Sequence, residues 1–173
     1  VGSVEEALSR GAKGVSVQVN MGSPEEPGMI ERLGLITQDS HYLDCPVLGM
    51  IYPRGKYLNV MEEDETDGAA HAARLAFELG CDVVKTKWTG SIESFKKVTS
   101  AVPIPVLIAG GPAESSTKDI LTIVEQAMQA GAGGVCMGRQ VFSHSNPKGM
   151  VSALKAIVHE RANVEQAMQE FGL

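Results

Sequence analysis

A lysine within an apolar run is the residue of this sequence whose type and position most directly suggest chemistry. Lys85 follows Val83 and Val84, and Lys87 comes two residues later. If this run forms a strand, alternation puts Lys85 and Lys87 on the same face. Burial and the like charge of Lys87 would favour the neutral amine, the nucleophile that attacks a carbonyl to form a Schiff base. Alternatively, Lys85 faces outward and reaches solvent between helices.

Tyr52 is a candidate for proton transfer. It ends an apolar run and directly precedes Pro53, Arg54 and Gly55, which turn the backbone sharply. A phenol at that position can pass a proton to or from a substrate oxygen. It can equally cap the core while its hydroxyl stays in water. Arg54 is either a surface charge or a contact for an anion.

Two glycine-containing pairs suggest a phosphate site. Gly110 and Gly111 remove side chains where the backbone must approach a ligand closely. Gly138 and Arg139 offer a bare amide beside a guanidinium. A single Gly-Gly pair is as often a turn as a ligand loop, but two such pairs after consecutive apolar runs favour a phosphate.

The elements that position these residues are indicated by a recurring pattern, in which a helix-like stretch ends in glycine and a short valine-rich run follows. Gly11, Gly80 and Gly131 occupy the position where a helix ends in a left-handed residue, and the runs after them are typical of strands in a parallel sheet. Two further runs begin with proline, which a strand tolerates at its first residue. The pattern predicts strands near residues 14–20, 46–52, 82–88, 105–110 and 133–139.

Helical patterns accompany these strands and define the fold class. They are expected at residues 3–10, 66–79, 91–98, 117–130 and 147–159. Strands that alternate with helices predict an α/β protein with a parallel sheet, in which ligands bind at the carboxyl ends of the strands. Tyr52, Lys85, Gly110 and Arg139 all fall at or near such ends.

Composition favours a single globular domain over residues 1–173 that acts on small molecules. The formal net charge is −6 and 43% of the residues are hydrophobic, which suffices for an ordinary core. With 21 acidic against 15 basic residues and no basic run, neither nucleic acid nor a membrane is expected as a partner. No signal peptide is recognised, and three cysteines without metal-ligand spacing suit a reducing, cytoplasmic compartment.

Metal chemistry finds little support in the sequence. The four histidines are His41, His71, His144 and His159. Three fall in segments expected to be helical and the fourth follows the last expected strand, so no pair has ligand spacing. We interpret all four as structural or surface residues and expect no cofactor. Cys136 is interpreted as a core residue and not a nucleophile. Trp88 either shields the lysine site or packs against a helix.

Four segments at the expected strand ends occur together in one known family. They are Met50-Ile-Tyr-Pro-Arg-Gly-Lys56, Val83-Val-Lys-Thr-Lys-Trp-Thr-Gly90, Ile108-Ala-Gly-Gly-Pro112 and Gly134-Val-Cys-Met-Gly-Arg-Gln-Val-Phe142. In this order they resemble the archaeal-type (DhnA-type) class I aldolases, over nearly the whole chain. The resemblance implies the fold of a (β/α)8 TIM barrel. It also implies a homo-oligomeric enzyme that acts on phosphorylated ketoses and aldehydes, without a metal or an organic cofactor.

The resemblance also implies roles for single residues. The Schiff-base lysine of the family corresponds to Lys85, and its proton-donating tyrosine corresponds to Tyr52. The residues that correspond to its substrate- and phosphate-binding positions are Pro53, Arg54, Gly110, Gly111, Gly138 and Arg139. These roles agree with those suggested by the residue types alone.

Within the family, the segment around Met50 is more similar to the 2-amino-3,7-dideoxy-D-threo-hept-6-ulosonate synthases, because the fructose-1,6-bisphosphate aldolases tend to have tryptophan at that position. The synthases transfer a three-carbon unit from a phosphorylated ketose to aspartate semialdehyde, on a route to aromatic amino acids. Gln18 replaces a histidine that the family tends to have. Fructose-bisphosphate aldolase activity remains the alternative.

The family barrel has eight strands and an acidic general base near the end of the first strand, and no segment of this chain matches that motif. We therefore expect the chain to hold the last five βα units of the barrel, strands 4 to 8. A further alternative is a catalytically incompetent fragment that only binds sugar phosphate. A third is an isomerase-type barrel that uses Lys85 only as a charge.

Overall fold

Glycine ends three of the helices, as the sequence pattern predicts. Gly11, Gly80 and Gly131 have φ angles of 90°, 84° and 88°, in the left-handed region that residues with a Cβ adopt only at a cost. The N–H of each glycine donates to a carbonyl in the last turn of the preceding helix. The chain therefore leaves each helix abruptly and enters the next strand within a few residues.

A single parallel sheet results from these helix-to-strand turns. The computed structural model describes residues 2–58, 65–110 and 116–173. Its strands are β1 (Val15–Met21), β2 (Val47–Pro53), β3 (Val83–Thr86), β4 (Val106–Ala109) and β5 (Gly134–Cys136). They are hydrogen-bonded in the order β1-β2-β3-β4-β5, with every neighbouring pair parallel. The five expected strands and their parallel arrangement are confirmed.

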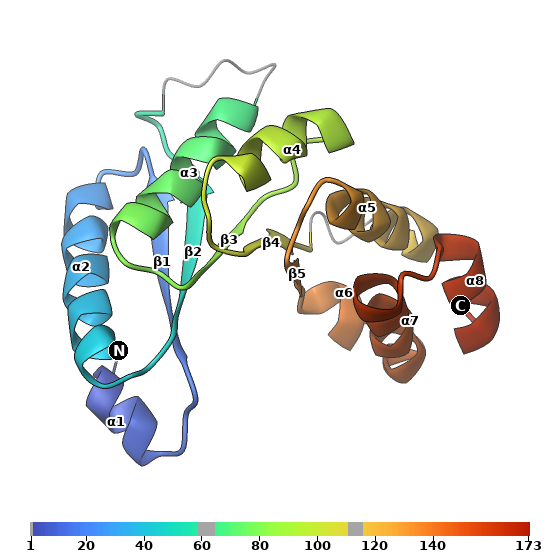
Figure 1. Ribbon diagram of the computed structural model, residues 1–173, viewed down its shortest axis with the longest axis horizontal. Coiled ribbons are helices and arrows are strands. Elements are labelled where there is room, and N and C mark those ends of the chain that lie inside the picture. The colour runs from blue at the N-terminus through green and yellow to red at the C-terminus, as the bar shows by residue number, and fades with distance from the viewer. Residues whose placement is uncertain (1, 59–64, 111–115) are drawn as a thin grey trace.

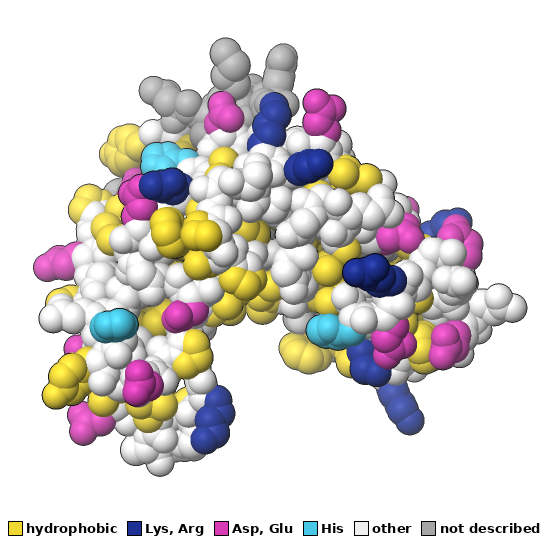
Figure 2. Space-filling model, viewed as in Figure 1, with side chains coloured by type: hydrophobic (Ala, Val, Ile, Leu, Met, Phe, Trp, Pro, Cys, Tyr) yellow, Lys and Arg dark blue, Asp and Glu magenta, His cyan; other side chains and the backbone are white. Residues whose placement is uncertain are grey.

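The helices cover one face of this sheet. They are α1 (Val4–Ser9), α2 (Glu26–Tyr42), α3 (Thr66–Glu78), α4 (Ile92–Ser100), α5 (Thr117–Gln129), α6 (Arg139–Phe142), α7 (Pro147–Glu160) and α8 (Val164–Phe171). In Figure 1 they form an arc outside the strands and leave the inner side of the sheet uncovered. Figure 2 shows the same inner side as a hollow in which hydrophobic side chains gather.

Burial along the strands follows this arrangement. In β2, Val47, Gly49 and Ile51 face the helices and are buried, whereas the intervening side chains are half-buried on the uncovered face. A Cβ on Gly49 would lie 2.8 Å from the Sγ atom of Cys81. Only glycine therefore allows β2 to approach the segment that leads from α3 into β3 this closely.

The hydrogen-bond register aligns residues of the uncovered face into a row. Gln18 pairs with Met50, Met50 with Lys85, Lys85 with Leu107, and Leu107 with Gly134. Each member comes from a different strand, so the row crosses the whole sheet. Lys85 occupies its centre.

Several boundaries differ from the sequence prediction. The strand expected at 82–88 ends at Thr86, and the strand expected at 133–139 ends at Cys136, because the helix α6 begins at Arg139. Neither α6 nor α8 was predicted, and α2 was indicated only around His41. Four residues in α6 are too few to show a helical period, and two glycines, Gly28 and Gly34, interrupt the apolar pattern of α2.

Candidate active site

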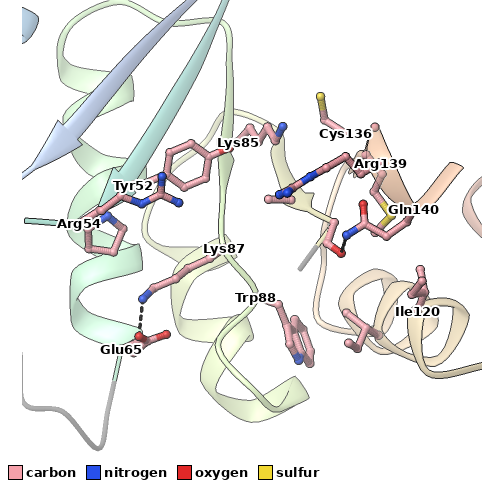
Figure 3. A pocket seen from close by; sticks show the side chains of 16 residues that line it. Tyr52, Arg54, Glu65, Lys85, Lys87, Trp88, Ile120, Cys136, Arg139 and Gln140 are labelled. Atoms are coloured by element: carbon pink, nitrogen blue, oxygen red, sulfur yellow. Dashed lines mark hydrogen bonds and ion pairs between the residues drawn. The ribbon is translucent and has the colours of Figure 1, made fainter. Parts of the chain in front are cut away.

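A pocket of about 530 Å³ opens at the carboxyl ends of β2 to β5. Every expected site residue within the described part of the chain lines it: Tyr52, Pro53, Arg54, Lys85, Gly110, Gly138 and Arg139. Gly111, the remaining one, lies outside the described residues. Figure 3 shows side chains from the ends of β2 and β3 and from the start of α6 around this space. The candidate site residues expected from the sequence therefore lie together in one pocket.

Lys85 lies on the uncovered face of the sheet. Its neighbours Val84 and Thr86 are fully buried toward the helices, so alternation turns Lys85 to the opposite side. Its half-buried side chain extends into the pocket between Tyr52 and Arg139 (Figure 3). The alternative in which Lys85 reaches solvent between helices is wrong, because the helices pack on the other face.

Lys87 also lines the pocket, but its charge is paired. Its Nζ atom lies 2.5 Å from the Oε1 atom of Glu65, the residue that precedes α3. The two side chains are 29% and 55% exposed. Figure 3 shows Lys87 directed toward Glu65 and away from Lys85. The like charge that the sequence placed beside Lys85 is therefore neutralised by a carboxylate that the sequence analysis did not single out.

Tyr52 and Arg54 stack at the β2 side of the pocket. The guanidinium carbon of Arg54 lies 5.3 Å from the centroid of the Tyr52 ring, a cation–π geometry. Tyr52 is half-buried on the uncovered face, two residues beyond Met50, which pairs with Lys85. Tyr52 therefore lies two residues nearer to the carboxyl edge of the sheet than the register position of Lys85.

Gly110 and Arg139 form the opposite side of the pocket. The side-chain amide of Gln140 donates a hydrogen bond to the carbonyl oxygen of Gly110. A Cβ on Gly110 would overlap the end of the Gln140 side chain, so a larger residue here would displace the Gln140 amide from this carbonyl. Gly138 precedes α6, and Arg139 is the first residue of that helix. In Figure 3 the Arg139 guanidinium reaches from α6 toward Lys85.

Cys136 and Trp88, which were not expected as site residues, also line the pocket. Cys136 is half-buried there, so its interpretation as a core residue is wrong: the strand ends at this position and its last side chain faces the cavity. Trp88 both borders the pocket and packs against α4, with its ring centroid 5.1 Å from that of Phe95. Glu65 and Gln140 had no recognisable signal, since each depends on contacts between distant segments.

His144 has a structural role, in agreement with the sequence interpretation. Its Nε2 atom lies 2.8 Å from the Thr117 hydroxyl, and its Nδ1 atom accepts a hydrogen bond from the N–H of Asn146. The ring thus connects the segment before α7 to the start of α5. Within residues 2–58, 65–110 and 116–173, no group of three or more His, Cys, Asp or Glu side chains is placed to hold a metal ion. Nor does any helix in these ranges have the length and apolar character needed to cross a membrane.

A parallel α/β sheet with a lysine at the centre of its uncovered face, beside a pocket at the strand ends, places a candidate nucleophile where sheets of this class bind their ligands. Residues 1–144 match the family model described as DeoC/LacD family aldolase, and the chain belongs to this family. The resemblance noted in the sequence is thereby confirmed.

Two relatives indicate which members of the family the chain resembles in sequence. The chain is 42% identical over 172 residues to 2-amino-3,7-dideoxy-D-threo-hept-6-ulosonate synthase from Halobacterium salinarum, an alignment covering 99% of this chain and 63% of that protein. It is 40% identical over 161 residues to 2-amino-4,5-dihydroxy-6-oxo-7-(phosphonooxy)heptanoate synthase from Streptomyces griseus, covering 92% of this chain and 57% of the relative.

Solved structures agree with these relatives. An archaeal fructose-1,6-bisphosphate aldolase, solved with its catalytic lysine covalently bound to a carbinolamine intermediate of the substrate, superposes with a TM-score of 0.84 at 37% identity. The match covers 90% of this chain and 62% of that structure. The chain thus spans less than two thirds of the length of these three relatives.

Proposed function

We propose that this chain carries the Schiff-base lysine, the proton-transfer tyrosine and the phosphate site of a class I aldolase or transaldolase that acts on phosphorylated ketoses. The observation that carries the proposal is the position of Lys85, whose amine enters the pocket between Tyr52 and Arg139. A nucleophile, an acid and an anion-binding group are thereby arranged around one space. No metal ion is needed, because an iminium ion accepts the electrons of the bond that breaks.

Lys85 begins the reaction. Its Nζ atom attacks the carbonyl carbon of the ketose, the former carbonyl oxygen leaves as water, and an iminium forms. The hydroxyl on the carbon beyond the scissile bond then gives its proton to a general base, for which the family uses the acidic residue that no segment of this chain matches. The hydroxyl carbon becomes an aldehyde, while the bonding electrons move to the iminium and give an enamine. The enamine adds to an acceptor aldehyde, and hydrolysis of the new iminium releases the product and restores Lys85.

Tyr52 and the residues at the other side of the pocket support these steps. The Tyr52 hydroxyl donates a proton to the oxygen of the acceptor as the new carbon–carbon bond forms. Arg139, beside the bare backbone of Gly110 and Gly138, binds the phosphate of the donor. Pro53 and Arg54 complete the wall at the β2 side, and Gly111 is part of the phosphate site in this proposal.

The substrate class follows from the relatives. The Streptomyces griseus protein is named for a seven-carbon 2-amino acid with a 6-oxo and a 7-phosphonooxy group. A ketone next to a phosphorylated carbon is what a Schiff-base donor leaves in the product. We infer that the intact enzyme joins a phosphorylated three-carbon donor to an amino-acid aldehyde in aromatic amino acid biosynthesis, in a reducing, cytoplasmic compartment and as a homo-oligomer.

A second candidate is fructose-1,6-bisphosphate aldolase activity, which the superposition on such an enzyme at 37% identity supports. Met50, the register neighbour of Lys85, supports the synthase. A third possibility is that this chain alone binds sugar phosphate without turnover, since one face of its sheet is uncovered by helices (Figure 1). Retro-aldol assays of this chain with fructose 1,6-bisphosphate distinguish turnover from binding alone.

Borohydride trapping tests the central proposal. Incubation with dihydroxyacetone phosphate and sodium borohydride should add the mass of the reduced adduct to Lys85, because hydride reduces the iminium to a stable amine. Lys85→Met should abolish the label at this position. Lys97→Met, which removes an exposed lysine of α4, is the matched control and should keep it. A wild-type chain that stays unlabelled at Lys85 would refute the proposal.

A further inference from the structure

Two lysines of the same strand end line one pocket. Lys85 and Lys87 are two residues apart, which in an extended chain corresponds to about 6.6 Å along the strand direction. Both are primary amines, and both lie within reach of a ligand of a few carbon atoms. Either amine is therefore close enough to attack the carbonyl carbon of a ketone bound in this space.

Only one of these amines is paired with an acid. Lys87 lies 2.5 Å from Glu65, whereas within residues 2–58, 65–110 and 116–173 the Lys85 amine forms neither a hydrogen bond nor an ion pair. Glu65 is also the only carboxylate among the described residues that line the pocket. The other charged or titratable groups there are Tyr52, Arg54, Cys136 and Arg139.

The position of Glu65 in its own helix indicates that its side chain serves Lys87. Glu65 is the residue before α3, and its side chain forms no hydrogen bond with the first helical N–H groups. The carboxylate instead extends to Lys87.

We propose that Glu65 is a positioning residue that keeps Lys87 out of the Schiff-base reaction, so that Lys85 alone condenses with the ketone. The inference rests on the proposed function. The ion pair directs Lys87 toward α3, away from the space between Tyr52 and Arg139 (Figure 3). The Lys87 nitrogen is thereby held away from a carbonyl carbon bound beside Lys85.

The test locates the label rather than measuring activity alone. The wild type, Glu65→Gln and the double variant Glu65→Gln/Lys87→Met are treated with dihydroxyacetone phosphate and borohydride, and the labelled lysine is identified by peptide mass spectrometry. In Glu65→Gln the ratio of Lys87 to Lys85 label should rise about two- to fivefold, the range that a partly exposed ion pair supports. The double variant should be labelled at Lys85 only.

The matched control is Glu78→Gln, which breaks an exposed ion pair of 2.6 Å with Arg74 at the other end of α3. It should leave the ratio of labels unchanged. If the wild type and Glu65→Gln are both labelled at Lys85 with the same ratio, the inference is wrong while the proposed function stands. If Lys85 is labelled in neither protein, the proposed function fails first, and the inference fails with it.

Discussion

Arg54 lies over the ring of Tyr52, with 5.3 Å between the guanidinium carbon and the ring centroid. Such a contact favours ring orientations that keep the cation over the ring face, by about 0.5–1 kcal/mol at an exposed site. Tyr52 lies beside Lys85 at the carboxyl edge of β2 (Figure 3). The orientation of a proton donor matters more for its catalytic effect than the strength of its contacts.

Tyr52→Phe separates proton transfer from Schiff-base formation. We expect the rate of carbon–carbon bond cleavage or formation to fall by about 10²- to 10⁴-fold, the usual contribution of a positioned acid or base. Borohydride labelling of Lys85 by dihydroxyacetone phosphate should persist, because the amine and the phosphate site are intact. A variant with an unchanged rate would exclude Tyr52 as the proton donor.

Arg139→Met addresses the phosphate site. A charge-assisted pair with phosphate is lost, so KM for dihydroxyacetone phosphate should rise about tenfold or more. KM for dihydroxyacetone, which has no phosphate, should change little. Arg139→Lys keeps the charge but not the planar fork, and should give an intermediate KM. Equal losses with both ketones would instead indicate that Arg139 supports the local fold.

Residue chemistry that depends on position in a strand could be predicted from the sequence, whereas chemistry that depends on tertiary contacts could not. Lys85 stands out because an apolar run makes its charge costly, and Tyr52 because it precedes a turn. Glu65 and Gln140 carry no such signal: their roles arise from contacts with Lys87 and with the Gly110 carbonyl, which only folding creates. Cys136 was misassigned because its strand is shorter than the sequence pattern indicates.

Among the elements, the segment between α3 and β3 packs closely against β2. Cys81 is buried there, with its Sγ atom facing Gly49, and Asp82 accepts a hydrogen bond of 2.8 Å from the N–H of Val47. Burial, and secondarily the negative charge of Asp82, raises the pKa of the Cys81 thiol from 9.0 to about 11. The fold therefore favours the neutral thiol.

The pKa of Cys81 makes stability depend on pH in the alkaline range. The folded-state pKa lies above the unfolded value, so the stabilisation is complete below pH 9 and is lost as the pH rises toward 11. We expect a loss of about 2 kcal/mol in the free energy of unfolding over this interval. Urea titrations at several pH values measure it. Cys81→Ala should show a shallower decline, and parallel declines would contradict the assignment.

The strands and the helices α3, α4, α5 and α7 were predictable because the residues that mark where they begin and end are local in the sequence. A glycine that ends a helix and a valine-rich run after it lie within ten residues, so Gly80 and the strand β3 could be recognised together. The short helix α6 could not be predicted, although it positions Arg139 and Gln140. Its four residues are too few to show a periodic pattern in the sequence.

For the molecule as a whole, the uncovered face of the sheet is a large surface with apolar character. Leu48, Met50 and Leu107 lie half-buried on it, and Figure 2 shows hydrophobic side chains gathered in the hollow. The aromatic ring of Phe142, in α6, is 80% exposed. Contiguous apolar surface and unpaired strand edges promote association between chains.

We therefore expect this chain on its own to associate as its concentration rises. Sedimentation velocity should show the mean sedimentation coefficient increasing with protein concentration. The increase should persist in high salt, because apolar contacts are not screened by ions. A coefficient that stays at the value of a monomer over the whole range would show that the uncovered face does not drive association.

The strand order of the sheet has a consequence for how a substrate is oriented. The strands lie side by side in the order in which they occur in the chain. Tyr52 on β2, Lys85 on β3 and Arg139 after β5 therefore follow one another across the pocket. In the proposed function, a ketose that condenses with Lys85 and gives its phosphate to Arg139 lies across the strands, with its scissile bond toward β2. Donor contacts then come from the β5 side of the pocket and acceptor contacts from the β2 side, so each can diversify without altering the other.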